Sequence, residues 1–527
     1  MKKLFKSCFI ALMAVVVSFA CFTGCGENSR EKEQISTDES GQITNVSGNL
    51  NIRLWEGGFG KDYLNNVVKG FKAKYPKVSV SVNANTLRKV VFQEIVGTSS
   101  RAEYDVYISD SLLSDYAEQF EDLTDVLDYK WTNESKTIRE KMDPLSVEIA
   151  QTKNNDKTYF LPTSVTPYGI AYNADLVDED EIPVTSDEFI KLCKSLKQNS
   201  ITPIIFSGDV DCNYWTFIYT TWYAQYQSVE EFRMAEVGKV RQADGSYVYD
   251  KSSAYLDGEL KAMQLCEEIL SPVNGYIYNR STGTGFITAQ IKFLDGEVAM
   301  MANGSWMLNE MQDLYPDGPA FKFRLMKVPV ISDIKDRCDS IADDSELSAL
   351  IRAIDSGSTA LMGDGYDVNQ ADFDRVKEAR SISYTLSSSH GAVIPKIAMN
   401  KTIAKLFLEY MYSDEGIEIV AKTGSGNFVP VTGHSYDNYY TGNDTESIFL
   451  SSCADLYENS QSFFDMYGKQ AISQLCIDAG SVTIERQFGS LNASDRVSAL
   501  DSYNNKKAMF TEQYFRDALY KFGYHID

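Results

Sequence analysis

The stretch LNIRLWEGGFGKDYLNNVVKGFKAKYPKVSVSV, residues 50–82, decides the fold class. Its first six residues alternate between apolar and polar side chains, which predicts a strand over residues 50–55. After a glycine-rich loop, apolar residues at helical spacing predict a helix that ends at Tyr75-Pro76, and VSVSV predicts a second strand. A strand, a helix and a strand in this order are typical of two parallel strands joined by a helical crossover.

The same alternation of strands and helices continues along the chain. A helix-like stretch leads to the strand YDVYISD, residues 104–110, and completes a β-α-β-α-β unit, which is typical of a parallel sheet. A second series begins near residue 169 and contains the helix SDEFIKLCKSLKQ, which Ser186 is expected to cap. The fold class is therefore predicted to be α/β. Further elements are expected as strands at residues 202–208, 298–304 and 391–396, and as one long amphipathic helix at residues 401–424.

The composition limits the classes of function. Of the 527 residues, 43% are hydrophobic and 24% are charged, as in globular proteins, and the chain is long enough for about two to four domains. The formal net charge is −24. A surface this acidic repels phosphate backbones, so we expect no nucleic acid as a partner. With three histidines and no HExxH motif, we also expect no metal site, and no motif indicates a cofactor.

The first 24 residues are predicted to be a lipoprotein signal peptide. A basic start is followed by an apolar run of 15 residues, Cys8 to Phe22, which is shorter than the roughly 20 residues of a membrane span. The run ends in Phe22-Thr23-Gly24-Cys25, which resembles a bacterial lipoprotein box, so Cys25 is the expected lipidation site. An ordinary signal peptide with an incidental cysteine is the alternative. The polar residues 25–48 are predicted to be a flexible tether.

These features predict export and attachment to the outer face of the cytoplasmic membrane, at the cell surface, by the lipid anchor only. Nine cysteines are present, and three of them belong to the export region. The others are far apart and form no CxxC motif, which favours scattered buried thiols over disulfides, although the sequence leaves both open. They are Cys193, Cys212, Cys266, Cys338, Cys453 and Cys476.

Several stretches, in this order, carry a resemblance to a known family. They are residues 50–82, YFLPTSVTPYGIAYNADL (159–176), PVTSDEFIKLCKSLKQNSITPIIF (183–206), FLDGEVAMMANGSW (293–306) and AVIPKIAMNKTIAKLFLEYMYSDEGIEIV (392–420). Together with the N-terminus they resemble the extracellular solute-binding proteins, family 1, of bacterial ABC importers, in the carbohydrate group and in lipoprotein form. The resemblance covers most of residues 49–430. A polar, helical insertion over residues 335–385 and a helical C-terminal extension after about residue 435 depart from it.

The resemblance implies a two-lobed periplasmic-binding-protein-like fold with a central ligand cleft. The chain would cross between the lobes near Thr166-Pro167-Tyr168-Gly169 and again near His390-Gly391. The implied domains are lobe 1, residues 49–166 plus about 388–432, and lobe 2, residues about 167–387 plus 433–527.

The resemblance also implies a function. The protein would capture a sugar or oligosaccharide outside the cell and deliver it to the transmembrane permease subunits of an ABC importer, without being an enzyme. Two alternatives remain open from the sequence. One is an exported glycan-acting enzyme such as a glycoside hydrolase, whose paired carboxylates sequence spacing cannot show or exclude. The other is a sensor or adhesion lipoprotein of the same fold.

Trp306 is the most informative candidate for ligand binding. It follows the apolar run Val298-Ala299-Met300-Met301 and the turn pair Asn303-Gly304. This position predicts a side chain at a corner between a strand and a helix, and Ser305 is expected to cap that helix. Trp306 is then either a platform for a sugar ring or a plug in the core.

The other candidates lie mostly where strands are expected to end, because ligands bind at the carboxyl ends of strands in open α/β sheets. Sugar rings stack on flat aromatic side chains, and their hydroxyls pair with carboxylates and amides. Core packing is the alternative for the aromatic residues, and a surface position for the carboxylates. The candidate ligand-binding residues are Trp55, Glu56, Asp110, Tyr168, Trp215, Ser305, Trp306 and Asn427.

Overall fold

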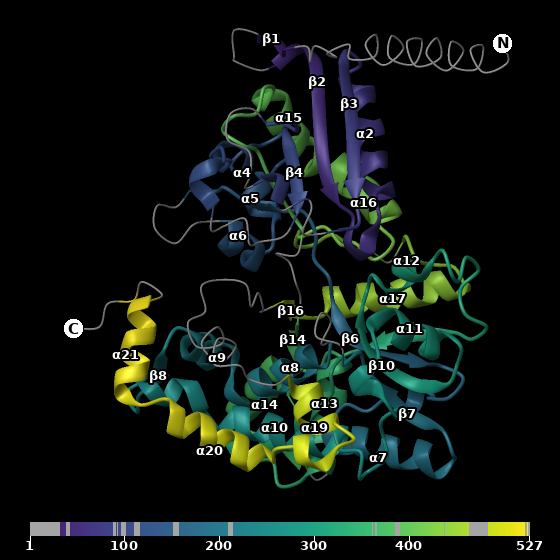
Figure 1. Cartoon of the computed structure of the whole chain (residues 1–527), viewed down its shortest axis with the longest axis vertical. Helices are drawn as coiled ribbons and strands as arrows, with labels where there is room; N and C mark the ends of the chain where they lie inside the picture. Colours follow the sequence, from purple (N-terminus) through teal and green to yellow (C-terminus); the bar gives the residue numbers. More distant parts are fainter. Residues whose placement is uncertain are drawn as a thin grey trace, which may run out of the picture.

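The computed structural model has two lobes, each built around its own β-sheet (Figure 1). Lobe 1 lies at the top of Figure 1 and lobe 2 at the bottom. The residues that the structure describes are 32–37, 43–87, 91, 93–95, 102–109, 116–150, 157–208, 214–360, 362–363, 366–384, 390–436, 438–462, 483–521 and 524.

The sheet of lobe 1 contains the strands predicted from residues 50–82. Strand β2 (Ile43–Trp55) pairs in parallel with β3 (Val78–Asn85) on one side and with β4 (Val106–Ser109) on the other. Helix α2 (Asp62–Lys74) connects β2 to β3 and buries the apolar residues whose spacing predicted it. The predicted β-α-β unit is therefore confirmed.

Two strands complete the sheet of lobe 1 from distant parts of the chain. Strand β15 (Gly391–Val393) pairs antiparallel with β4 on one side and with β5 (Leu161–Pro162) on the other. Helices α15 (Lys401–Met411) and α16 (Asp414–Thr423) follow β15 and pack with α2. Lobe 1 thus combines the first part of the chain with residues beyond 390.

The sheet of lobe 2 has the order β11-β6-β10-β7, formed by Phe323–Met326, Tyr168–Asn173, Val298–Gly304 and Thr202–Ile205. Both faces of this sheet are covered, and all seven residues of β10 are buried. Side chains of one face, including Ile170 and Met300, belong to the larger core, whereas Ala171 and Met301 belong to a second core with Phe449 and Leu456 of α17 (Thr445–Glu458). Helix α8 (Trp215–Gln227) packs on the first face and beside α10 (Asp257–Leu270).

Three segments of chain cross between the lobes. The first is residues 163–168, and it lies between a second segment at His390 and a third at Phe428. Val165 exchanges backbone hydrogen bonds with Phe428, and the Thr163 N–H donates to His390 O over 2.8 Å. On the lobe 2 side, the Tyr168 N–H donates to Tyr384 O over 3.2 Å. The predicted two-lobed fold is therefore confirmed, and backbone hydrogen bonds join the crossing segments to one another.

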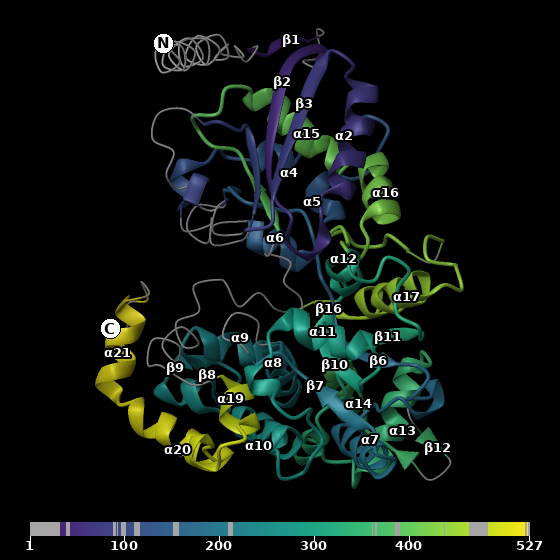
Figure 2. The same cartoon turned by 45° about the vertical axis from the view of Figure 1, so that its right-hand side comes forward.

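The insertion and the C-terminal extension are helical, as predicted, and both pack on lobe 2. The insertion contains α13 (Asp344–Asp355) and α14 (Gln370–Ser381). The extension contains α19 (Ile484–Gly489), α20 (Ala499–Met509) and α21 (Glu512–Lys521), which lie along the outer side of lobe 2 in Figures 1 and 2.

The remaining helices and short strands are α4 (Thr124–Leu127), α5 (Ile138–Lys141), α6 (Pro144–Ala150), α7 (Ser186–Gln198), α9 (Val229–Glu236), α11 (Phe286–Leu294), α12 (Met307–Met311), β1 (Gln34–Thr37), β8 (Lys239–Arg241), β9 (Tyr247–Tyr249), β12 (Met362–Gly363), β13 (Tyr366–Asp367), β14 (Ile382–Ser383) and β16 (Gln461–Ser462).

The predicted flexible tether is wrong for the described residues of that segment. Strand β1 pairs antiparallel with the first part of β2, which begins at Ile43. The carboxylate of Glu33 accepts hydrogen bonds from Thr402 and from the Ile403 N–H at the start of α15. These polar residues are ordered by backbone pairing and helix capping, which composition does not reveal.

Two predicted helix boundaries are also wrong. The helix expected over residues 401–424 is divided into α15 and α16, because the Ser413 hydroxyl accepts a hydrogen bond from the Gly416 N–H and starts a new helix. Helix α7 is capped by Thr185, whose hydroxyl accepts from the Glu188 N–H, and Ser186 is its first residue.

Four of the six cysteines that follow residue 48 are free thiols, namely Cys193, Cys266, Cys338 and Cys453, whereas Cys212 and Cys476 lie outside the described residues. Burial raises the pKa of the thiols of Cys193, Cys266 and Cys338, which makes them poor nucleophiles. No helix in the described part of the chain has the length and apolar character needed to span a membrane.

Candidate functional site

Five aromatic rings of lobe 2 meet where the first crossing segment enters the sheet. The Trp306 ring lies 4.6 Å from that of Tyr168 and 5.6 Å from that of Tyr214, measured between centroids. Phe217 contacts Tyr168 at 4.2 Å and stacks on Tyr384 at 4.5 Å. We call these five residues the lobe 2 aromatic cluster. Their T-shaped and stacked contacts fix ring orientations at small cost in side-chain entropy.

A second aromatic group lies at the facing edge of lobe 1. The Trp55 and His390 rings are stacked, with centroids 4.5 Å apart and planes inclined by 7°, and Phe59 meets His390 edge-on at 5.3 Å. The Trp55 indole N–H donates to Thr86 O over 3.3 Å. Trp55 is partly exposed, so one part of its ring remains accessible at the lobe junction.

The glycine pair after Trp55 brings the two groups together. A Cβ atom on Gly58 would lie 2.6 Å from Trp306 Cδ1, and the Asn309 side chain of α12 donates to Gly58 O over 2.7 Å. Gly57 has φ 53° and touches His390, where a Cβ would lie 2.6 Å from the imidazole. The absence of side chains at this pair therefore lets the loop after β2 lie directly against Trp306 of the other lobe.

Several hydroxyl and amide groups are buried near the lobe junction without a hydrogen-bond partner among the described residues. They are Ser109 Oγ at the end of β4, Ser164 Oγ and Thr166 Oγ1 in the first crossing, and both polar atoms of the Asn427 side chain. A buried polar group without a partner is costly, so such groups usually indicate water or a ligand. These atoms can pair with a ligand that carries several hydroxyls.

Three of the predicted site residues, Trp55, Tyr168 and Trp306, lie at this junction. The Ser305 hydroxyl donates to Gly426 O over 2.6 Å, which places Ser305 beside the residue that precedes Asn427. The predicted cap on α12 is wrong, since Ser305 makes this contact instead and Trp306 precedes the helix without a side-chain cap. Glu56 is partly exposed on the loop after β2, and Asp110 lies outside the described residues.

Trp215 is not brought to the junction. Its side chain is fully buried and meets Trp222 at 6.1 Å in the interior of lobe 2. The neighbouring Tyr214 and Phe217 take part in the lobe 2 aromatic cluster in its place. Sequence reasoning missed Phe217, Tyr384 and the two hydroxyls of the first crossing, although Tyr214 and Phe217 are spaced by one helical turn.

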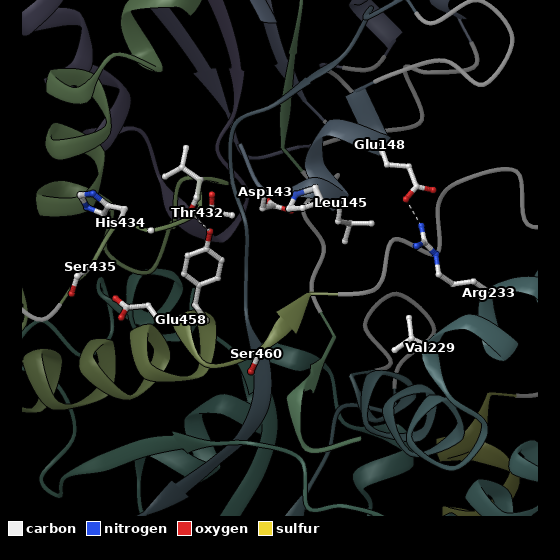
Figure 3. Close-up of a pocket in the computed structure, with 14 residues that line it drawn as sticks. Asp143, Leu145, Glu148, Val229, Arg233, Thr432, His434, Ser435, Glu458 and Ser460 are labelled. Atoms are coloured by element: carbon white, nitrogen blue, oxygen red, sulfur yellow. Dashed lines mark hydrogen bonds and ion pairs between the residues drawn. The ribbon is translucent and has the colours of Figure 1, made fainter. Parts of the chain in front are cut away.

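A separate cavity of about 650 Å³ lies between the lobes (Figure 3). None of the aromatic residues of the junction lines it. On one side, Glu148 of α6 and Arg233 of α9 form an ion pair that joins lobe 1 to lobe 2. Burial raises the pKa of the Asp143 carboxyl and lowers the pKa of the His434 imidazole, because it disfavours the charged form of each group.

No cluster of three or more potential metal-ligating His, Cys, Asp or Glu side chains is present in the part of the chain that the structure describes. The site is therefore defined by aromatic rings, hydroxyls, an amide and close backbone approach. Such a combination is suited to noncovalent capture of a polar molecule that has apolar faces.

The chain belongs to the bacterial extracellular solute-binding protein family, whose model matches residues 60–418. This is a family of binding proteins, and its name places its members outside the cell. No curated protein sequence matches the chain.

Several solved structures have the same fold. The GacH receptor of Streptomyces glaucescens GLA.O, solved unliganded and with acarbose, has a TM-score of 0.55 and 14% identity, covering 91% of this chain and 100% of its own. The binding protein RafE in complex with raffinose has a TM-score of 0.52 and 17% identity, covering 88% and 100%. Maltose-bound MalE3 of T. maritima has a TM-score of 0.52 and 14% identity, covering 88% and 98%.

Proposed function

We propose that the protein is a lipid-anchored substrate-binding protein that captures a sugar or oligosaccharide outside the cell and delivers it to an ABC importer permease. The observation that carries this proposal is the position of Trp306, which lies between the lobes and is supported by Tyr168 and Tyr214. Proteins of similar fold bind acarbose, raffinose and maltose.

The chemistry of the junction favours a carbohydrate over other polar solutes. The apolar C–H face of a sugar ring matches the flat ring of a tryptophan or tyrosine. Its equatorial hydroxyls can donate to and accept from Ser164, Thr166 and Asn427, which have buried polar atoms without partners in the described structure. An anionic ligand is disfavoured by the net charge of −24.

Binding is proposed to favour the closed arrangement of the lobes. Trp306 touches Gly58 of the opposite lobe, so a ligand inserted beside it contacts both lobes. A ligand that contacts both lobes binds the closed arrangement more tightly than the open one, and its binding therefore shifts the population toward the closed arrangement. Small-angle scattering at saturating sugar should show compaction, and an unchanged radius of gyration would contradict this step.

A thermal-shift screen with maltose, raffinose and acarbose tests the binding proposal, with free amino acids as the comparison. A sugar present at 100 times its Kd should stabilise the protein by about 2.7 kcal/mol. Stabilisation by amino acids and not by any sugar would refute the carbohydrate assignment. Chromatography of the incubated sugars would reveal shortened products if the protein were instead a glycan-acting enzyme.

The lipid anchor is proposed to be attached at Cys25, which lies outside the described residues. Cys25→Ala should release the protein into the medium or leave the signal peptide uncleaved. Cys21→Ala is the matched control and should leave the protein on the membrane. Mature Cys25→Ala protein that remains membrane-bound would refute the anchor.

A further inference from the structure

The C-terminal extension contacts the helix that carries part of the lobe 2 aromatic cluster. Helix α8 begins at Trp215, and the residue before it, Tyr214, provides no side-chain cap. The N–H groups of the first helical turn need partners, and the start of α8 is partly buried, which limits their access to water. Glu485 of α19 supplies one, because its Oε1 accepts a hydrogen bond from the Thr216 N–H over 3.1 Å.

Glu485 is completely buried, and its carboxylate accepts the hydrogen bond from the Thr216 N–H at the start of α8. Its second oxygen, Oε2, has no partner among the described residues. Burial raises the pKa of Glu485 to about 7. Burying a carboxyl group is costly unless its hydrogen bonds compensate, so its placement at the start of α8 indicates a capping role.

Helix α19 also contacts the residues that follow β7 and lead toward Tyr214. A Cβ atom on Gly489 would lie 2.8 Å from the Phe206 ring, and the Arg486 side chain donates to Gly208 O over 3.5 Å. Phe206 and Gly208 follow β7, and Tyr214 comes shortly after them in the chain. Helix α19 therefore contacts the chain on both sides of residues 209–213.

Helix α20 fixes this arrangement to the outer side of lobe 2. The Ala499 N–H donates to the Glu267 carboxylate over 2.9 Å, and the Lys506 ammonium donates to Glu259 over 2.6 Å. Glu259 and Glu267 belong to α10, which packs beside α8. The extension is thus attached to lobe 2 independently of Glu485.

We propose that the C-terminal extension acts on the binding site indirectly, through Glu485. This positioning residue caps α8. The capped helix holds Tyr214 and Phe217 against Trp306 and Tyr168. The proposal rests on the proposed carbohydrate function. Glu485 touches no ligand in this scheme. It sets the geometry of one wall of the cleft and thereby the sugars that the wall accepts.

Two conservative substitutions separate the hydrogen bond from the charge. Glu485→Gln keeps an acceptor oxygen at the same reach, and Glu485→Asp keeps the carboxylate but shortens the side chain by one methylene. Neither leaves a large cavity, so both variants should fold. Gln487→Ala is the matched control, since Gln487 is buried in the same helix and its side-chain nitrogen has no hydrogen-bond partner among the described residues.

Hydrogen–deuterium exchange of the free, full-length protein is the first measurement, and it needs no ligand. Glu485→Asp should accelerate exchange in residues 214–221 and 303–307, whereas Glu485→Gln and Gln487→Ala should match the wild type there. Faster exchange restricted to α19 in Glu485→Asp would overturn the proposal. Impaired Glu485→Gln with normal Glu485→Asp would also overturn it, because the charge and not the hydrogen bond would then matter.

Affinity for maltose and raffinose is the second measurement. Glu485→Asp should weaken whichever of these sugars binds by roughly tenfold, comparable to the loss of a helix cap, while Glu485→Gln stays within about twofold. Equal affinity in all variants, despite altered exchange, would overturn the link to binding. If neither sugar binds the wild type, the carbohydrate assignment fails for these probes, and the exchange experiment still decides whether Glu485 positions α8.

Discussion

Trp215 and Trp306 follow strand ends of the same sheet, yet they occupy different environments. Trp306 lies at the lobe junction beside Tyr168 and Tyr214 and reaches Gly58 of lobe 1. Trp215 is fully buried beside Trp222 and contributes to the interior of lobe 2. A strand end therefore determines which residues come near the cleft, but the phase of the following helix determines which side chains face it.

The helical phase of α8 makes this difference explicit. Trp215, Ile218 and Trp222 recur at the spacing of one face and all are buried in the core. Tyr214 and Phe217 lie on a different face and contact the aromatic rings at the junction. Adjacent residues in the sequence thus serve stability and, as we propose, binding.

The largest effect is expected for Trp215→Ala, which should reduce the free energy of unfolding by about 3–5 kcal/mol through the cavity that it leaves. Once only the folded protein is counted, sugar affinity should fall less than in Trp306→Ala, because the Trp215 side chain does not face the junction and Glu485 still caps α8. Urea denaturation and calorimetric titration measure the two quantities. A selective loss of affinity with unchanged stability would reverse the roles assigned to the two tryptophans.

For Trp306→Ala, we expect sugar affinity to fall by roughly 1–3 kcal/mol, by analogy with bases stacked on aromatic side chains. The free energy of unfolding should fall less than in Trp215→Ala, because Trp306, although buried, packs where lobe 2 meets Gly58 of lobe 1, whereas Trp215 is fully buried inside lobe 2. The same two measurements apply. A large loss of stability with unchanged affinity would identify Trp306 as a core plug, and Trp55 and Tyr168 would become the better candidates.

Gly58→Ala tests the approach of lobe 1 to Trp306 from the other side. The new methyl group would lie within 2.8 Å of Trp306 atoms, so we expect sugar affinity to fall by about 1 kcal/mol as the ring or the loop shifts. Gly283→Ala is the control, because its Cβ would meet nothing within 4 Å. Equal affinities in the two variants would show that the lobes need not approach this closely.

The smallest effect is expected for Phe217→Leu. Loss of the ring contacts with Tyr168 and Tyr384 should lower affinity by about 0.5–1 kcal/mol, within the range for aromatic pairs. Ile218→Val, on the core face of the same helix, should lower stability slightly and leave affinity unchanged. If Ile218→Val lowers affinity and Phe217→Leu does not, the two faces have been assigned in the wrong order.

Much of the fold could be predicted because its signals are local. The alternation in residues 50–55, the helical spacing from Tyr63 to Phe71 and the apolar run at Val298 report burial directly. The break between α15 and α16 also has a local signal, since Ser413 is followed by two acidic residues, as at a helix start. Strand β1 gave no comparable signal, because its polar residues are held by pairing with a neighbouring strand.

The candidate site could be predicted only in part. Trp55 and Trp306 were found because they follow predicted strands, and Tyr168 because it lies near a predicted crossing. Distinguishing Tyr214 from Trp215 requires the helical phase of α8, which decides which of the two side chains faces the junction. The contact between Thr216 and Glu485 joins residues 269 positions apart, and nothing local to either residue indicates it.

The position of β15 has a consequence for the order in which the protein can fold. This strand lies between β4 and β5, although it is made more than 200 residues after them. While the chain folds, β5 therefore has no sheet partner until residues 391–393 reach it, and the sheet of lobe 1 stays incomplete until then. Long-range strand pairing of this kind is slow. Until that pairing forms, the chain has an unpaired strand edge, which makes incompletely folded lobe 1 prone to aggregation.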